Sequence, residues 1–363
     1  MSGTPLHVPE MDYLRAFAIL AVLAIHVSAG FTAIPAINSL MIVNVVIDIF
    51  THYAVPLFIF ISGFVLYLKY NRNYSVRSFA KKRFLRIIPP YLIFTTFYLL
   101  FGICKTKILT GMYAWPSILQ ILYAYFAAGA FYHLWFFLII IELYLLYPVI
   151  TRCYHFFADR NYDWLFVVLA LILQLGWEIF GANYQLHLAG YDLDITNKLF
   201  LCRFFYFALG IYVCSHYAEI KEWVLRKPIW TYVGPTILFT AIGSGIWLYG
   251  VWAAGTYATY SLYESLMQPL SYLFTFALLY VLCHKLVSGK KDVKWLLTIG
   301  AYSFGIFLIH PFFQNGIMYL LQHIGITQET AVYYPVVFLS VLICSIIFVW
   351  IMQKIPGHTY IIG

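Results

Sequence analysis

The 363-residue chain has few charged side chains, and this scarcity excludes most classes of soluble protein. Asp, Glu, Lys and Arg make up 10% of its residues, and hydrophobic side chains make up 63%. A soluble globular domain carries about 25% charged residues. The composition therefore predicts an all-α polytopic membrane protein.

The chain also lacks several features that would indicate other kinds of protein. Its six cysteines are scattered in or beside apolar segments, without the spacing of a metal or redox site. The first apolar segment has neither a Lys/Arg-rich leader nor a small-residue cleavage site, so we expect a retained span. Because no linker, low-complexity tract, repeat or soluble appended domain is evident, we expect one membrane domain over residues 1–363.

The apolar segments predict about ten transmembrane helices when about 20 residues are taken as one span. The segment 40–68 is too long for one straight span, and Pro56 removes a backbone donor within it, which predicts a broken helix. The amphipathic stretch Trp115–Gly129 is too short to cross and predicts an interfacial or re-entrant helix. The predicted spans are 12–30, 40–68, 88–104, 132–150, 163–180, 198–216, 230–250, 264–285, 296–321 and 331–352.

Basic residues gather in alternate loops, which predicts the orientation of the spans. The loop 69–86 alone holds seven Lys and Arg residues. The positive-inside rule makes this basic loop cytoplasmic and places both termini on the same side. The other basic residues of this side are Arg152, Arg160, Lys221, Arg226, Lys227, Lys285, Lys290, Lys291 and Lys294, whereas the opposite loops hold only Lys105, Lys107 and Lys198.

The first span contains an arginine and a histidine on one helix face. Arg15 and His26 are eleven positions apart, which is about three turns and roughly 16 Å along the axis. The predicted orientation puts Arg15 near the cytoplasmic interface and His26 near or beyond the midplane. Two structural explanations stay open, namely a snorkelling arginine and a histidine bonded to a neighbouring helix.

Other ionisable residues lie within predicted spans, where each costs a few kcal/mol. Asp48 and His52 are four apart and can form a carboxylate–imidazole pair, for which a structural role is the simpler explanation. Glu142 is either a helix-packing partner or a site residue. His310 lies deep in its span before Pro311. Snorkelling at the outer interface is the default explanation for four others: His133, Glu178, Arg203 and Glu264.

The run FAKKRFLRIIPPY carries Arg83 and Arg86 three positions apart. Guanidinium groups at this spacing can hold phosphate oxygens with paired hydrogen bonds. The alternative is that these residues only set the topology and contact anionic lipids.

Five motifs follow one another over nearly the whole chain. They are Arg15 and His26, VPLFIFISGF with Ser62, Arg83 and Arg86 with Pro89, His133 to Trp135, and SFGIFLIH ending at His310. Together, and in this order, they resemble the acyltransferase-3 family of bacterial membrane-bound O-acyltransferases. Ala54-Val55-Pro56 departs from the family's common Gly-Val-Asp and resembles the branch of enterobacterial common antigen and exopolysaccharide acyltransferases.

The resemblance implies an enzyme that transfers an acyl group, most often acetyl, from cytosolic acyl-CoA to a hydroxyl of a cell-envelope glycan or lipid-linked sugar. His26 would be the general base or the acyl carrier, and Arg15 would anchor phosphate or stabilise developing negative charge. Lys82, Arg83 and Arg86 would bind coenzyme A. The expected supporting residues are Asp48, Ser62, His133, Trp135, Glu142 and His310.

The same resemblance sets the expected partners and location. Acyl-CoA is a co-substrate, and we expect no permanently bound cofactor, no metal and no nucleic acid. Membrane lipids surround the protein in a bacterial plasma membrane, and the oligomeric state stays open. The alternatives are a transporter, an acyl channel that passes its group to a separate transferase, and a membrane sensor domain like that of certain resistance-associated racemases.

Overall fold

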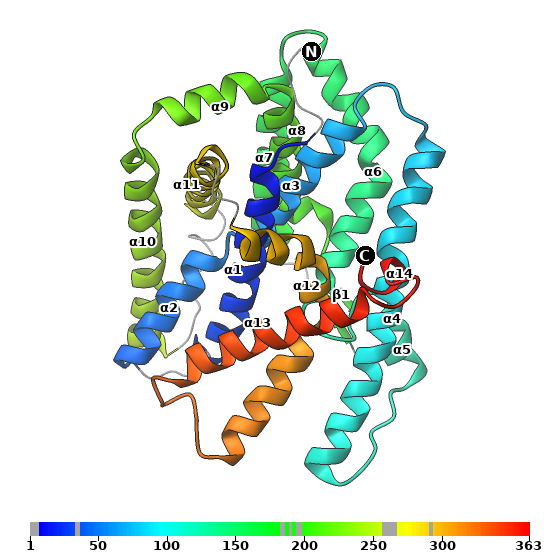
Figure 1. The fold of residues 1–363 in the computed structure, drawn as a ribbon, viewed down its shortest axis with the longest axis vertical. Coiled ribbons are helices and arrows are strands. Elements are labelled where there is room, and N and C mark those ends of the chain that lie inside the picture. The colour runs from blue at the N-terminus through cyan, green and yellow to red at the C-terminus, as the bar shows by residue number, and fades with distance from the viewer. Residues whose placement is uncertain are drawn as a thin grey trace. The chain divides into compact units, whose positions relative to one another are not determined.

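The computed structural model describes residues 7–32, 37–181, 186–188, 191–193, 198–255, 267–289 and 293–363. These residues are overwhelmingly helical, apart from one antiparallel pair of short strands, β1 (Leu186–Leu188) and β2 (Tyr191–Leu193). Figure 1 shows the helices and strands in chain order by colour. The chain forms two compact units. Unit 1 contains Met1–Leu68 and Val213–Ile351, and unit 2 contains Lys69–Tyr212 and Met352–Gly363.

Unit 1 is organised around its first helix. Helix α1 packs against α2, α11 and α12, and α10 packs against α2 and α11. Met41, Val45 and Ile49 of α2 form a buried apolar cluster with Trp247 and Val251 of α10. The helices of this unit are α1 (Glu10–Thr32), α2 (Ser39–Thr51), α3 (Ala54–Lys69), α9 (Tyr217–Arg226), α10 (Trp230–Ala254), α11 (Gln268–Ser288), α12 (Lys294–His323) and α13 (Tyr333–Met352).

A glycine allows α1 and α12 to approach each other closely. A Cβ atom at Gly300 of α12 would lie 2.3 Å from the backbone oxygen of Asp12. Every other residue type carries this atom, so the backbones can meet here only at glycine. The same two helices meet again where Gln314 bonds His26. Because Asp12 precedes His26 and Gly300 precedes Gln314, the helices run in the same direction.

The predicted break in the second apolar segment is confirmed, and it lies just before Pro56. Helix α2 ends at Thr51 and α3 begins at Ala54. Pro56 falls in the first turn of α3, where a missing N–H costs little. Side chains satisfy two carbonyls in the last turn of α2: Thr51 Oγ1 lies 2.7 Å from Ile47 O, and His52 Nδ1 lies 2.7 Å from Asp48 O.

Unit 2 contains the basic run with Lys82, Arg83 and Arg86, and aromatic side chains pack in its core. Phe79 stacks on Tyr147 with ring centroids 5.0 Å apart, and the Tyr147 hydroxyl donates to Tyr70 O at 2.5 Å. Its elements, beside β1 and β2, are α4 (Val76–Thr110), α5 (Ile118–Phe126), α6 (Trp135–Ala158), α7 (Asp163–Gly181), the 3-10 helix η1 (Phe200–Arg203), α8 (Phe204–Ser215), whose end reaches unit 1, and α14 (Thr359–Ile362).

The prediction of a basic loop over residues 69–86 is wrong in its second half. Helix α4 already begins at Val76, because the Ser75 side chain caps it by accepting the N–H of Ser78 at 3.3 Å. Lys, Arg and Leu are good helix formers, so the helix continues from the basic run into the apolar segment. Arg83 and Arg86 are therefore displayed on a helix.

Among the described residues, eight helical segments are long and apolar enough to cross a membrane, with α2 and α3 counted as one. The predicted spans 163–180 and 198–216 form α7 and η1–α8, which are not among the eight. The short stretch after Trp115 forms α5, which begins with a capping box between Ser117 and Gln120. Ten spans and cytoplasmic termini stay predictions.

Candidate active site

Helix α1 presents both residues of the predicted pair on one continuous helix. Arg15 lies in its second turn, where Nη1 is 2.7 Å from Asp12 Oδ1. The other carboxylate oxygen of Asp12 lies 2.8 Å from His7 Nε2. The Arg15 side chain is 32% exposed, so part of it stays accessible. Its guanidinium is thus oriented from within its own helix, with donors left to face a ligand.

His26 meets a second histidine from a distant part of the chain. Its imidazole stacks on that of His310, with ring centroids 5.2 Å apart and an angle of 22° between the planes. Gln314, one turn after His310 on α12, donates from Nε2 to His26 O at 2.7 Å. His310 is fully buried, whereas His26 is only partly buried. The sequence singled out each histidine separately, and the fold brings them together.

The proline after His310 fixes which ring nitrogen of His310 carries a proton. Pro311 has no N–H, so the carbonyl of Phe307 loses the donor that a helix would normally supply. His310 Nδ1 lies 2.9 Å from this oxygen and 3.2 Å from Ile306 O. Since a carbonyl only accepts, Nδ1 must be the donor, and in the neutral ring Nε2 is then the acceptor.

The predicted Asp48–His52 pair is present beside His26. Asp48 Oδ2 and His52 Nδ1 are 3.5 Å apart. The Ser28 hydroxyl, two residues after His26, donates to Asp48 Oδ1 at 2.9 Å. Ser28 therefore ties the carboxylate of α2 to the helix that carries His26. Ser62, another predicted supporting residue, is partly buried within α3.

The predicted donor-binding residues lie near the beginning of α4 in unit 2. The Arg83 guanidinium carbon lies 5.2 Å from the ring centroid of Tyr70. Arg86 donates from Nε and Nη2 to the backbone oxygen of Gly363, each at 3.1 Å. Lys82 is exposed on the same turn. The two guanidinium groups thus have different neighbours, although three positions separate them.

Three more predicted supporting residues lie in unit 2. His133 is buried, and its ring lies edge-on to Tyr98 with centroids 5.1 Å apart. Trp135 begins α6 next to it. Glu142 Oε2 accepts the N–H of Phe200 at 2.6 Å, at the start of η1. Of the two explanations that the sequence left open for Glu142, this contact supports helix packing.

Two other ionisable residues of the predicted spans contact each other in the structure. Arg203 Nη1 lies 3.3 Å from Glu178 Oε1, so these two residues pair with each other instead of each snorkelling alone. Glu264, Lys290 and Lys291 lie outside the described residues. The described part of the chain holds no group of three or more His, Cys, Asp or Glu side chains placed to bind a metal ion.

Sequence reasoning missed a polar cluster at the beginning of α1. Glu10 is buried and lies 2.8 Å from His284 Nδ1 and 3.8 Å from Lys221 Nζ. Beside it, the Tyr217 and Tyr280 hydroxyl oxygens are 2.9 Å apart. Burial raises the pKa of Tyr217 to about 12, so this phenol stays protonated at neutral pH. The one sequence signal was an acidic residue at the start of an apolar span.

Comparison with known proteins gives one match. The model of the acyltransferase-3 family, described as an acyltransferase domain, matches residues 8–350. This range includes Arg15, His26, Arg83, Arg86 and His310. No curated protein and no solved structure matches the chain.

Proposed function

The chain belongs to the acyltransferase-3 family and is a membrane acyltransferase, and we propose that it transfers an acetyl group from cytosolic acyl-CoA to a hydroxyl of a cell-envelope glycan or lipid-linked sugar. The observation that carries this proposal is the contact between His26 and His310. An imidazole is the side chain best suited to move a proton near neutral pH. Here one lies on a helix that also carries Arg15.

The reaction needs one proton to move twice. His26 takes the proton of the acceptor hydroxyl as its oxygen attacks the thioester carbonyl. The tetrahedral intermediate then collapses, the carbon–sulfur bond breaks, and the imidazolium returns the proton to the thiolate. The products are an ester and free coenzyme A. Direct transfer of this kind is favoured over an acyl-histidine intermediate, because His26 then needs only to hold a proton.

His310 and Gln314 would position His26 for this step. The stacked ring of His310 limits the planes that the His26 ring can adopt, and Gln314 holds the backbone at the same residue. His310 itself is held by the carbonyls of its own helix. Such a support reduces the reorganisation needed when the transition state forms.

The donor's phosphate groups are assigned to Lys82, Arg83 and Arg86. Coenzyme A carries a 3′-phosphate and a pyrophosphate, and guanidinium groups bind such oxygens with paired hydrogen bonds. Arg15 is partly accessible and would contact donor phosphate or the developing negative charge. The Arg86 donors that bond Gly363 O are those that a phosphate oxygen would use.

The acceptor and the location follow from the family branch that the sequence resembles. A carbohydrate of the bacterial cell envelope, reached from the plasma membrane, fits a transferase whose reacting histidine lies inside a membrane-crossing helix. Aromatic side chains, which form 20% of the chain, offer faces on which sugar rings can stack.

One observation favours a second candidate, a channel or transporter that passes a group to a separate transferase. The helix break between α2 and α3 lies beside Asp48 and His52. Broken helices with nearby charges are common where a substrate crosses a membrane. This alternative predicts that the purified protein makes no acylated product without a partner enzyme.

The decisive experiment uses the purified full chain in lipid vesicles, with radiolabelled acetyl-CoA and an envelope glycan extract. We expect labelled glycan from the unmodified protein, and about a 1,000-fold loss in His26→Ala. His323→Ala, which removes an exposed histidine at the end of α12, is the matched control and should keep full activity. Near-normal transfer by His26→Ala at equal protein level would refute the role of His26.

A further inference from the structure

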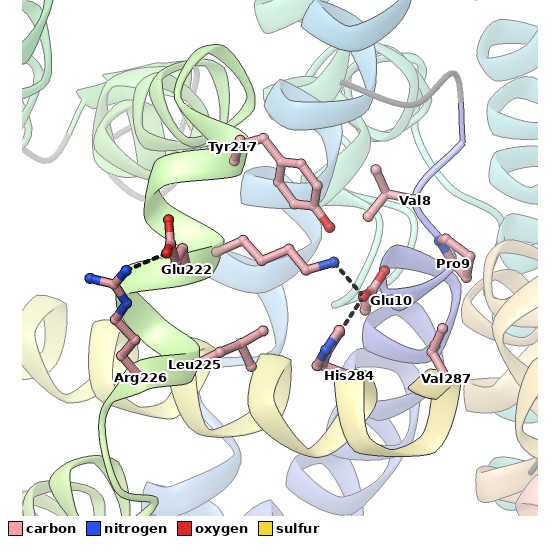
Figure 2. A pocket seen from close by; sticks show the side chains of 11 residues that line it. Val8, Pro9, Glu10, Tyr217, Glu222, Leu225, Arg226, His284 and Val287 are labelled. Carbon is pink, nitrogen blue, oxygen red and sulfur yellow. Dashed lines mark hydrogen bonds and ion pairs between the residues drawn. The ribbon is translucent and has the colours of Figure 1, made fainter. Parts of the chain in front are cut away.

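A cavity of about 830 Å³ lies beside the buried Glu10 cluster in unit 1 (Figure 2). Its walls come from the residues before and at the start of α1, from α9, and from the last turns of α11. They include Val8, Glu10, Tyr217, Lys221, His284 and Val287. This volume falls in the range of small-molecule sites. The proposed acyl transfer uses none of these residues.

The charges around this cavity balance. Glu10 and Glu222 supply two carboxylates, and Lys221 and Arg226 supply two permanent cations. Figure 2 shows Glu10 facing His284, while Glu222 pairs with Arg226. Glu10 also lies 3.8 Å from Lys221 Nζ. The two carboxylates and the two Lys and Arg cations together have no net charge. A ligand with a net charge would leave one charge uncompensated, whereas a zwitterion matches both signs.

Lys221 and the Glu222–Arg226 pair can exchange partners at little cost. Lys221 Nζ is 3.8 Å from Glu10, which is beyond hydrogen-bond range, so its three donors suit an incoming anion. Glu222 and Arg226 pair across one turn of α9, with 63% and 75% of their side chains exposed. Exposed pairs of this kind contribute little stability. A bound phosphate and a bound ammonium can therefore replace them.

The cavity lies at the ends of two membrane-crossing helices. Glu10 is the first residue of α1, and His284 and Val287 lie in the last turns of α11. Helix α9 buries Tyr217 and Val224 and leaves Trp223 60% exposed. A short amphipathic helix with an exposed tryptophan is typical of the membrane interface. The cavity thus opens at the level of phospholipid headgroups.

We propose that this cavity binds the headgroup of a zwitterionic phospholipid that carries a primary ammonium, as in phosphatidylethanolamine. The phosphate contacts Lys221, and the ammonium contacts Glu222. The apolar side chains of Val8, Leu225 and Val287 receive the glycerol region. A primary ammonium is favoured because three N–H donors can serve the carboxylate, whereas a quaternary ammonium has none.

The test compares lipids that differ in one group. The full chain is placed in nanodiscs that contain equal amounts of phosphatidylethanolamine, phosphatidylcholine and phosphatidylglycerol, and native mass spectrometry measures the lipid retained. We expect phosphatidylethanolamine to be enriched, and Lys221→Ala to reduce that enrichment about tenfold. Lys227→Ala, an exposed cation of the same region outside the cavity, should leave it unchanged. Glu222→Gln should also reduce the enrichment, whereas Glu219→Gln, which removes a carboxylate outside the cavity, should leave it unchanged.

Three outcomes would overturn the proposal. Equal retention of the three lipids, or an enrichment that persists in both Lys221→Ala and Glu222→Gln, would exclude a headgroup site here. Displacement of the lipid by soluble phosphoethanolamine at equal concentration would assign the same charges to a soluble ester instead. Lys221→Met, which keeps most of the apolar stem, separates loss of the charge from loss of folding.

Discussion

Two regions of the molecule hold their candidate site residues in different ways. The first is the contact between α1 and α12, and the second is the beginning of α4. At the first, His310 is bonded to helix carbonyls and the His26 backbone is bonded by Gln314. At the second, Arg86 is exposed and donates to the backbone oxygen of Gly363. A reacting group needs a fixed geometry. A phosphate at a membrane surface can instead be captured by mobile cations, because Coulomb attraction tolerates small displacements.

Among the variants that test this difference, loss of His310 should lower the rate of acyl transfer most. We expect His310→Ala to lower kcat about 10- to 100-fold with little change in the KM for acyl-CoA, because His26 loses its stacked support. Steady-state kinetics in vesicles provide the measurement. Pro311→Ala sharpens the result, since a new N–H would compete for Phe307 O and alter the pH profile. Pro235→Ala, within α10, is the control. An unchanged kcat in His310→Ala would contradict the positioning role.

The arginines of α4 should show the opposite pattern. In Arg83→Ala/Arg86→Ala we expect the KM for acyl-CoA to rise about tenfold at low salt, with kcat nearly unchanged, because two charge-assisted contacts to phosphate are lost. The difference should shrink at 1 M salt, where screening acts within about 3 Å. Arg77→Ala, an exposed arginine on the same helix, is the control. An unchanged KM at every salt concentration would leave these residues with a role in topology alone.

Removing residues 359–363 should change the KM for acyl-CoA by less, and in the opposite direction. Deleting residues 359–363 removes the oxygen that Arg86 bonds. We expect the KM for acyl-CoA to fall about two- to fivefold, as the guanidinium then meets its phosphate without competition. Tyr360→Ala, which removes an exposed side chain and keeps the backbone, should not change KM. A higher KM after the deletion would show that α14 supports the site instead of competing for it.

The smallest expected effect concerns a surface ion pair of unit 2. The Arg72 guanidinium bonds Asp159 and holds the pKa of this carboxyl below its ordinary value. A lowered pKa stabilises the fold above the ordinary value of about 3.9, and this contribution is lost as the pH falls through the lower folded value. Melting temperatures in detergent should therefore exceed those of Asp159→Asn slightly at pH 6 and match them at pH 2. An equal difference at both pH values would exclude the ion pair as its cause.

Local spacing made part of the site predictable. Arg15 and His26 share a face because eleven positions are three turns, and Asp48 reaches His52 because four positions are one turn. The break before Pro56 follows from a missing donor in an overlong apolar segment. The chemistry of single residues and the helical period were sufficient for these features.

Contacts between residues that are far apart in the sequence could not be predicted from local spacing. Nothing in α1 alone indicates that Gly300 will meet Asp12, or that Gln314 will bond His26. The buried Glu10 is explained only by its contact with His284, which lies 274 positions later. The basic run before Pro89 was predicted to be a loop because its charges indicated topology, although the same residues favour a helix after the Ser75 cap.

The contact between His26 and Gln314 also bears on how the protein is made, because 288 positions separate the two residues. At about 5 to 20 residues per second, a ribosome needs roughly 15 to 60 seconds to synthesise the intervening chain. During that time α1 is present without α12, and His26 lacks its partner histidine. A truncated or stalled product that lacks α12 therefore lacks the contact between His26 and His310, and the acyl transfer proposed above requires α12 to be in place.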